Sequence, residues 1–190
     1  MKKRFIADLW FSDQSKIFHI FLIVVIKWFP SSVDGILPRN IFKGGRESDG
    51  SVTYVGRAFH NGNYLPAEIT PSKSCAKVSW NGHVYPKTNY ELLVGNDYKW
   101  ETFCESNKKF YEKHAVSTGM TIFGEMAFVG RASYRGSLLI GRLQFSQKCL
   151  HVPFKCKEFT LNTFEILVHD PERKNSEMME GKSTLKGLNI

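Results

Sequence analysis

Two arginines and two glutamates recur in the sequence at one interval. Arg57 and Arg131 are 74 residues apart, and Glu91 and Glu165 are separated by the same distance along the chain. A guanidinium next to a carboxylate forms an ion pair, and either group can instead bind a polar ligand. We favour a structural ion pair at both places and keep a ligand contact as the alternative.

Residue patterns typical of catalysis or metal binding are missing from the sequence. It contains no GxSxG, no P-loop and no dinucleotide-binding motif. It also has no CxxC, and no histidine lies at a spacing that completes a zinc site. We therefore expect a protein that is not an enzyme and needs no cofactor and no metal. We expect reduced and mostly buried thiols at Cys75, Cys104, Cys149 and Cys156.

The interval of 74 residues extends well beyond the charged pairs. Residues 54–94 align with residues 128–168 without a gap, and twelve of the 41 pairs are identical. The phrase "YVGRAFHNGNYLP" thereby returns as "FVGRASYRGSLLI". A gapless match of this length indicates a duplicated structural unit.

Within each unit, short β-rich runs alternate with turn residues such as "HNGN" and "PSKS". We predict strands at 51–58, 64–70, 76–80 and 90–94, and again at 126–132, 138–144, 150–154 and 164–168. Only residues 105–116 could coil, and we place them between the units. The prediction is an all-β fold in which two tandem pseudo-repeats of short antiparallel strands form one compact β-domain. Trp80 and Phe154 occupy equivalent strands, where core packing is favoured over a sugar-stacking role.

The charge and the two ends of the chain allow further expectations. The net charge of +8 is spread without a basic block, which favours a solvated surface over a nucleic-acid site. Residues 1–27 combine "MKKRF" with the apolar run "IFHIFLIVVI". The run suits a buried strand or accessory segment, and the alternative is a signal peptide or anchor. It is too short for a stable membrane span, and we expect a cytoplasmic protein, or a secreted one if residues 1–27 are a signal peptide. The polar residues 170–190 predict a disordered tail.

A longer phrase carries a family resemblance. The segment "GGRESDGSVTYVGRAFHNGNYLPAEITPS", followed by an aromatic strand and "YELLV", resembles the DM-nine repeat family. The segment "WFPSSVDGILP" at 28–38 resembles the usual start of that repeat, and Trp100 opens the second unit in the same way. The resemblance covers residues 28–169, and it implies a first repeat at 28–99 and an eroded second repeat at 100–169.

The resemblance implies a two-repeat β-protein, and at least some members of the family are mannose-binding lectins that need no metal. In those lectins each repeat offers a carboxylate shortly after "GG" and a lysine in a "P-G-K" strand. The carboxylate accepts hydrogen bonds from sugar hydroxyls and the ammonium donates to them, so one pair grips two adjacent hydroxyls.

Carried over to this sequence, the carboxylate position of the first repeat is Glu47, with Asp49 as the second candidate. The lysine position is Glu68, a reversal of charge. We expect Glu47 and Glu68 to form a pair of carboxylates that lacks a cation, so that Glu68→Lys would strengthen mannose binding. The alternative is that Glu47, Asp49 and Glu68 are solvated surface charges.

In the second repeat the lysine position is Arg142, which keeps the cation. The acid position falls on Thr121, or on Glu125 if a short gap is allowed. We expect Arg142→Ala to remove any weak mannose binding.

Two functions follow from the resemblance and from these departures. The first is a metal-independent, mannose-type lectin-like protein that acts in innate recognition and whose partners are mannose-containing glycans. The alternative is a non-catalytic β-module for protein interaction whose sugar site has decayed. A homodimer formed by exchange of equivalent strands fits a duplicated β-unit.

Overall fold

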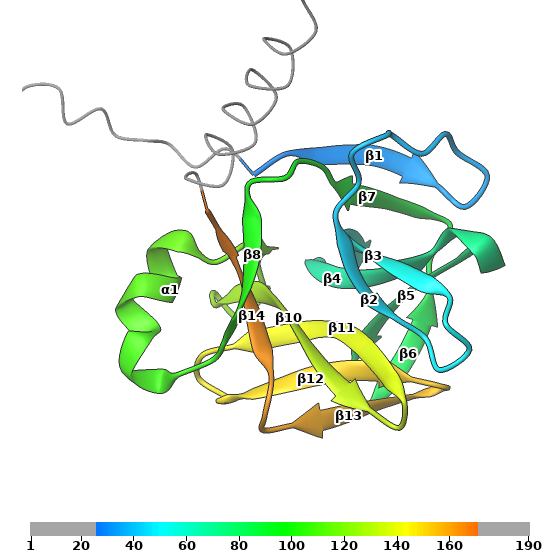
Figure 1. Cartoon of the computed structure of the whole chain (residues 1–190). Helices are drawn as coiled ribbons and strands as arrows, with labels where there is room; N and C mark the ends of the chain where they lie inside the picture. The colour runs from blue at the N-terminus through cyan, green and yellow to red at the C-terminus, as the bar shows by residue number, and fades with distance from the viewer. Residues whose placement is uncertain (1–25, 171–190) are drawn as a thin grey trace, which may run out of the picture.

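The structure, a computed structural model, describes residues 26–170 of the 190-residue chain (Figure 1). The predicted extension at 1–27 and the predicted tail at 170–190 therefore lie almost wholly outside the described residues. Within the described range the chain consists mainly of β-strands, with one short α-helix and two 3₁₀ turns. The all-β prediction is confirmed.

Every strand of the first unit has a counterpart in the second. The first unit contains β1 (Trp28–Ser32), β2 (Lys43–Arg46), β3 (Val52–His60), β4 (Asn63–Thr70), β5 (Cys75–Trp80), β6 (His83–Pro86) and β7 (Asn89–Leu93), with the 3₁₀ turn η1 (Pro71–Lys73). The second contains β8 (Tyr98–Thr102), β9 (Ser117–Met120), β10 (Met126–Tyr134), β11 (Ser137–Gln144), β12 (Cys149–Phe154), β13 (Lys157–Leu161) and β14 (Glu165–His169), with η2 (Glu105–Asn107) and α1 (Lys108–His114). All eight predicted strands are present, as β3, β4, β5, β7, β10, β11, β12 and β14.

The longest hairpin of each unit closes with a two-residue turn. Asn61 and Gly62 join β3 to β4 with φ values of 46° and 80°. Arg135 and Gly136 join β10 to β11 with φ values of 47° and 81°. A two-residue hairpin turn with positive φ at both positions strongly favours Asn-Gly. The duplicated turn therefore keeps its shape even though the second copy has an arginine in place of the favoured residue.

The two units form one continuous sheet. Its strand order is β1-β7-β3-β4-β5-β6-β13-β12-β11-β10-β14-β8, and all pairings are antiparallel. The units meet where β6 pairs with β13, through His83 and Lys157. Figure 1 shows β1 to β7 at the upper right and the hairpins of the second unit below them.

The equivalent strands β2 and β9 each lie against the opposite unit. β2 pairs with β3 of its own unit and, through Arg46 and Leu138, with β11 of the other. A Cβ on Gly45 would lie 2.0 Å from the Leu138 carbonyl oxygen, so this approach requires glycine. β9 pairs with β10, and the Thr118 hydroxyl donates a 2.7 Å hydrogen bond to the Tyr64 carbonyl of β4. The strand exchange that we expected between two copies thus occurs between the halves of one chain, and the homodimer itself stays a prediction.

An arginine holds each of the two crossing strands, β2 and β9, which lie against the opposite unit. Arg57 lies 2.6 Å from Glu91, donates a 3.0 Å hydrogen bond to the Thr118 carbonyl of β9, and stacks 4.8 Å from the centre of the Trp28 ring. Because one side chain holds β3, β7, β9 and β1 together, the predicted structural ion pair is confirmed in the first unit.

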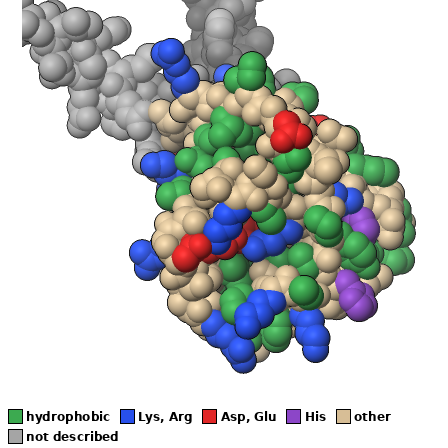
Figure 2. All heavy atoms as spheres, turned by 90° about the vertical axis from the view of Figure 1, so that its right-hand side faces the viewer, with side chains coloured by type: hydrophobic (Ala, Val, Ile, Leu, Met, Phe, Trp, Pro, Cys, Tyr) green, Lys and Arg blue, Asp and Glu red, His purple; other side chains and the backbone are tan. Residues whose placement is uncertain are grey.

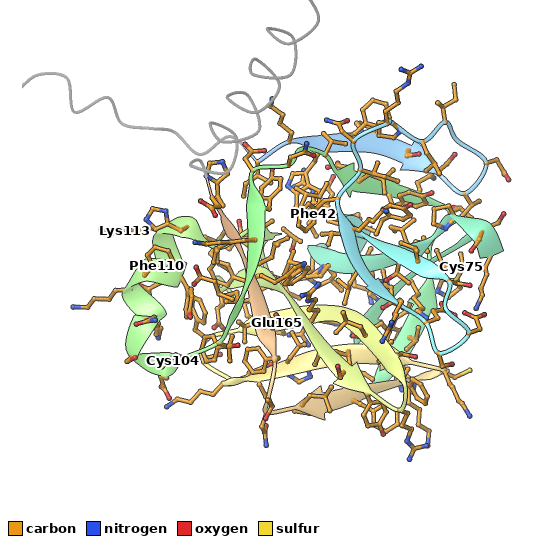
Figure 3. The ribbon with its side chains drawn as sticks, viewed as in Figure 1. Phe42, Cys75, Cys104, Phe110, Lys113 and Glu165 are labelled. Carbon is orange, nitrogen blue, oxygen red and sulfur yellow. The ribbon has the colours of Figure 1, made fainter. Side chains whose placement is uncertain are left out.

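Arg131 repeats the same set of contacts in the second unit. It lies 2.6 Å from Glu165, donates to the Gly44 carbonyl of β2 at 3.1 Å, and stacks 4.4 Å from the Trp100 ring. Figure 3 shows Glu165 in the interior of the view, beside β14. The two halves therefore share one internal frame, related by the interval seen in the sequence.

Three clusters of buried apolar side chains make up the core. One lies within the first unit and includes Trp80, which confirms the predicted packing role of that residue. A second lies within the other unit, and Phe154 packs against its edge. The third combines both units through Val55, Leu93, Tyr98, Val116, Val129, Ile140 and Leu167. This shared cluster makes the two repeats one domain.

The helix α1 lies between β8 and β9, on the outside of the second unit (Figure 1). This helix lies in the segment 105–116 that we expected to coil, between the two aligned units 54–94 and 128–168. The helix buries Tyr111, whose hydroxyl donates to the Thr102 carbonyl at 3.3 Å. Within residues 26–170, no helix has both the length and the apolar character to cross a membrane.

The four cysteines carry free thiols. Cys75 and Cys149 are partly buried, whereas Cys104 and Cys156 are exposed, so the expectation of mostly buried thiols was wrong for the latter two. In Figure 3, Cys75 and Cys104 lie on opposite sides of the molecule. This separation excludes a disulfide between these two in the folded chain.

Candidate functional site

A cluster of charged side chains gathers on the first unit, where the β2–β3 turn meets β4 and β5. The turn carries Glu47 and Asp49, β4 carries Glu68, and β5 carries Lys77. Glu68 and Lys77 are direct partners in the antiparallel register of β4 and β5, so their side chains share one face of the sheet. In Figure 2, which turns the right-hand side of Figure 1 toward the viewer, acidic and basic side chains lie side by side near the middle of this face.

Two lysines connect the three carboxylates of this cluster. The Lys77 ammonium lies 2.9 Å from Glu68 Oε1 and 3.4 Å from Glu47 Oε1. The Lys73 ammonium lies 2.5 Å from Glu47 Oε2 and 2.6 Å from Asp49 Oδ2. The expectation that Glu47 and Glu68 lack a cation was therefore wrong. Strand β5 and the η1 turn supply the ammonium groups that β4 does not.

The cluster runs from a fully buried group to an exposed one. The Glu68 side chain has 0% exposure, and its Oε2 accepts a 2.9 Å hydrogen bond from the Ile140 backbone N–H of the second unit. Lys77 and Glu47 side chains are 17% and 19% exposed, and that of Asp49 is 52% exposed. A ligand can thus reach Glu47, Asp49 and Lys77, while Glu68 supports Lys77 from below.

The environment of each group determines its pKa. Burial raises the pKa of Glu68, and the Lys77 charge offsets only part of this effect. Burial alone would raise the pKa of Glu47 as well, but the hydrogen bond from Lys73 and the charge of Lys77 outweigh it and lower that pKa below 4.5. Burial opposes the charge on Lys77, yet the Glu68 carboxylate raises the Lys77 pKa above 10.5. At neutral pH, Glu47 and Lys77 are therefore an ionised acid–base pair.

The corresponding place in the second unit is closed. Arg142 is buried, and its guanidinium lies 4.7 Å from the centre of the Trp80 ring, which in turn stacks with Phe123. Arg142 also contacts Gln144 and lies 3.4 Å from Glu158. Burial lowers the pKa of Arg142, and the nearby Glu158 charge counteracts this effect. Almost none of the Arg142 surface is available to a ligand.

Neither sequence candidate for the acid of the second repeat is the direct partner of Arg142. The Thr121 side chain is buried and donates to the Glu125 carbonyl at 3.0 Å. The Glu125 carboxylate accepts hydrogen bonds from the Ser146 N–H at 2.9 Å and from the Ser146 hydroxyl at 2.6 Å. The ion pair of Arg142 is with Glu158, on β13, which the sequence comparison did not single out.

The sequence interpretation also missed Lys77 and Lys73. A signal for Lys77 was available, because the short "PSKS" connection makes β4 and β5 an antiparallel hairpin and sets Lys77 opposite Glu68. No comparable signal places Lys73, since its contacts depend on how the η1 turn lies against the β2–β3 turn. Among residues 26–170, no group of three or more His, Cys, Asp and Glu side chains is arranged to hold a metal ion.

The sequence matches a known protein family. The DM9 repeat matches the sequence over residues 47–161 and again over residues 127–181, which together exceed half of the chain. The chain belongs to the DM9 repeat family. The two overlapping matches agree with the duplication, and the resemblance noted from the sequence is confirmed. Among curated proteins, none matches the sequence.

One solved structure shows the same fold. The nematode sperm cell motility protein MFP2B superposes with a TM-score of 0.62 and 14% sequence identity. The match covers 77% of this chain and 47% of that chain, so the DM9 protein spans about half the length of this neighbour. Neither the family description nor that of the neighbour names a catalytic activity. At this level of identity the likeness concerns the fold alone.

Proposed function

We propose that this DM9 protein is a non-catalytic, metal-independent carbohydrate-binding protein whose site lies on the first unit. The observation that carries the proposal is the pairing of Glu47 and Lys77, an ionised carboxylate and an ammonium 3.4 Å apart at the surface. A sugar with two adjacent hydroxyls, such as mannose, can donate to the first and accept from the second.

The surroundings of the pair support this role. Glu68, whose Oε2 accepts from the Ile140 N–H, holds Lys77 from below through its Oε1, while Thr70 donates to Glu47 Oε1 at 3.1 Å. Both groups are thus oriented before a ligand arrives, which reduces the entropy lost on binding. Because Arg142 is buried, the proposal assigns this acid–base type of sugar site to the first unit alone.

Isothermal titration calorimetry with mannose tests the proposal. Glu47→Gln removes the carboxylate charge but leaves the Glu68–Lys77 pair intact, and we expect it to weaken binding by about tenfold or more, the loss typical of one charged hydrogen bond. Glu125→Gln is the matched control, because Glu125 lies in the equivalent β9–β10 turn of the second unit, and it should bind as the wild type does. Asp49→Asn separates the two acid candidates and should have the smaller effect. An absence of mannose binding by the wild-type chain, or equal losses in Glu47→Gln and Glu125→Gln, contradicts the proposal.

An exposed apolar patch favours a second candidate function, protein interaction. Phe59, Tyr64, Met120, Ile122 and Phe123 are exposed and come from β3, β4, β9 and the turn after β9. Apolar groups gathered on a surface mark interaction sites. If this function holds, Met120→Ser and Phe123→Ser abolish capture of a partner that both the wild type and Glu47→Gln retain.

A further inference from the structure

A recess with a positive charge lies on the second unit, where β2 crosses the β10–β11 hairpin. Its volume is about 500 Å³, and its charged lining consists of Lys43, Arg46, Arg131 and Arg135. Among the residues that the structure describes, no aspartate or glutamate lines it. We call this hollow the basic recess. Because its cations come from two segments almost 90 residues apart, the sequence showed no basic block here.

Three of these four cations have no acidic partner among residues 26–170. Arg131 is paired with Glu165 at 2.6 Å and belongs to the internal frame. Lys43, Arg46 and Arg135 are exposed, and within residues 26–170 no carboxylate forms an ion pair with any of them. An adjoining hollow of about 480 Å³, which Lys43 and Arg131 also line, adds Arg39. Like charges that converge without a counter-charge raise the local concentration of anions.

The duplicated frame shows that the fold does not need these cations. At an interval of 74 residues, Lys43 corresponds to Ser117, Arg46 to Met120 and Arg135 to Asn61. These three residues lie where β9 crosses the β3–β4 hairpin of the first unit. The hollow itself is also filled there, since Phe59 and Tyr64 stand where the basic recess has Ser133 and Leu138. The Tyr64 ring packs 4.7 Å from the Arg57 guanidinium. One backbone therefore supports both a filled apolar surface and an open cationic hollow.

Arg135 adds an independent observation. It has a φ of 47°, which side chains other than Gly, Asn and Asp rarely adopt, and the equivalent residue with a φ of 46° is Asn61. Ser74, Lys148 and Lys155 adopt similar φ values in other turns, so Arg135 is set apart by the position of its charge and not by its backbone. The Arg135 guanidinium is held 5.4 Å from the Tyr134 ring and 5.9 Å from the Phe154 ring. These contacts keep the cation at the mouth of the recess.

The chemistry of the lining selects the ligand. Guanidinium groups bind sulfate and phosphate through paired hydrogen bonds, and Lys43 adds a point charge. Between the cations, the lining consists of Ser133, Ser137 and glycine backbone together with Tyr134 and Leu138, so polar groups for sugar hydroxyls lie beside apolar surface for the sugar ring. A volume of this order accommodates a small ligand. The nearby Trp100 ring is already stacked with Arg131, and the Tyr134 ring of the lining packs against Arg135, Phe154 and Phe159. Because both rings already have packing partners among residues 26–170, the recess is poorly suited to stacking the bases of a single-stranded nucleic acid.

We propose that the basic recess binds a small sugar that carries sulfate or phosphate esters, with Lys43, Arg46 and Arg135 holding the esters. This site is separate from the Glu47–Lys77 pair, and it neither requires nor excludes mannose binding there. The two ester types share one recognition chemistry, and the titrations below distinguish them.

The test uses calorimetric titration of the full chain with a sulfated heparin disaccharide, mannose 6-phosphate, inorganic sulfate and inorganic phosphate. Arg46→Met and Arg135→Asn install the residues that the first half of the frame already carries, so both variants should fold, which thermal unfolding verifies. Lys109→Met also removes one positive charge, but from the exposed surface of α1, and it is the matched control.

We expect at least one of the two ester-bearing sugars to bind more tightly than either inorganic anion, and the tighter sugar identifies the ester. Measured in the Glu47→Gln background, which removes the proposed mannose site from the titration, Arg46→Met and Arg135→Asn should each weaken its binding about tenfold or more, while Lys109→Met leaves it unchanged. An equal loss in Lys109→Met, binding of inorganic anions as tight as that of the sugars, or no binding at all overturns the proposal. Tighter binding of a single-stranded oligonucleotide than of either sugar replaces the proposed ligand class with nucleic acid.

Discussion

At the scale of single residues, the decisive feature of this DM9 protein is that the buried charge of the candidate site, Glu68, is paired with a residue of the neighbouring strand. Glu68, which occupies the lysine position of the family's sugar-binding pattern, is balanced by Lys77 on the neighbouring strand. The first unit thus keeps an acid and a base, but β4 carries the carboxylate of Glu68 and β5 carries the ammonium of Lys77.

This pairing reverses the expectation for Glu68→Lys. The substitution would place a second ammonium beside Lys77 at a position with 0% exposure and would remove the acceptor of the Ile140 N–H. Breaking a buried ion pair costs about 3–5 kcal/mol, so the variant should be destabilised by about that amount and should bind mannose no better. Urea unfolding of Glu68→Lys, with the exposed Asp49→Lys as the control, measures the difference. A Glu68→Lys protein as stable as the wild type contradicts this account of the pair.

A dependence on pH follows from Glu47. Its folded-state pKa lies below its unfolded value of 4.5, so its contribution to stability is present above pH 4.5 and is lost as the pH falls through the lowered value. We expect Glu47→Gln to be less stable than the wild type by about 1 kcal/mol at pH 7, and the difference should shrink steadily below pH 4.5. Denaturant titrations of both proteins between pH 7 and pH 3 provide the measurement. A difference that stays constant across this range means that the Glu47 charge is not the stabilising group.

The sequence predicted some residues of the site and not others. Glu47 and Asp49 could be located because the family pattern gives their distance from "GRA". The burial of Glu68 and Arg142 could not be predicted, because each is covered by the opposite unit, through Ile140 in one case and Trp80 in the other. Contacts between units leave no local pattern in the sequence of either one.

At the scale of secondary-structure elements, the two crossing strands hold the halves together. β2 reaches the second unit and β9 the first, and an arginine bonded to a backbone carbonyl holds each of them. The strong β-runs were predictable from composition and turns. β2 and β9 were not, because "KGGR" and "STGM" carry no β-rich alternation, and both depend on tertiary contacts.

The closest approach of β2 to the second unit should be sensitive to one methyl group. A Cβ on Gly45 would lie 2.0 Å from the Leu138 carbonyl oxygen, a backbone atom that cannot move aside. We expect Gly45→Ala to destabilise the protein by about 1–3 kcal/mol, the usual cost of overpacking. Ser48→Ala, in the exposed turn after β2, is the control and should change stability little. Thermal unfolding compares the two, and an unchanged Gly45→Ala protein contradicts the described crossing.

At the scale of the whole molecule, the repeats are two halves of one folding unit. The shared core cluster draws residues from both halves, the sheet runs through β6 and β13, and each half lends a strand to the other. The duplication was visible in the sequence. The sharing of the core was not, since a gapless repeat is equally compatible with two independent domains.

Each half should therefore fail to fold alone. We expect fragments 26–97 and 98–170 to lack cooperative unfolding, because each would expose its part of the shared cluster and would lose the strand that the other half contributes. The intact chain should unfold in one transition by calorimetry, with agreeing van't Hoff and calorimetric enthalpies. A fragment that unfolds cooperatively on its own would show that the halves are separate domains.

The divergence of the two halves is the main functional conclusion from the whole molecule. The same backbone frame occurs twice but carries different side chains. The first copy has the Glu47–Lys77 pair and the apolar patch, whereas the second has the buried Arg142 and the basic recess. The two proposals therefore assign different ligands to the two halves.

The measurement that tests the central claim most directly is a crystal structure of the protein grown with mannose. Our account predicts that the sugar lies on the first unit, with adjacent hydroxyls bonded to the Glu47 carboxylate and the Lys77 ammonium, and that no sugar contacts Arg142. Mannose bound at Arg142, or a well-ordered structure at saturating mannose in which Glu47 and Lys77 remain without sugar, would contradict it.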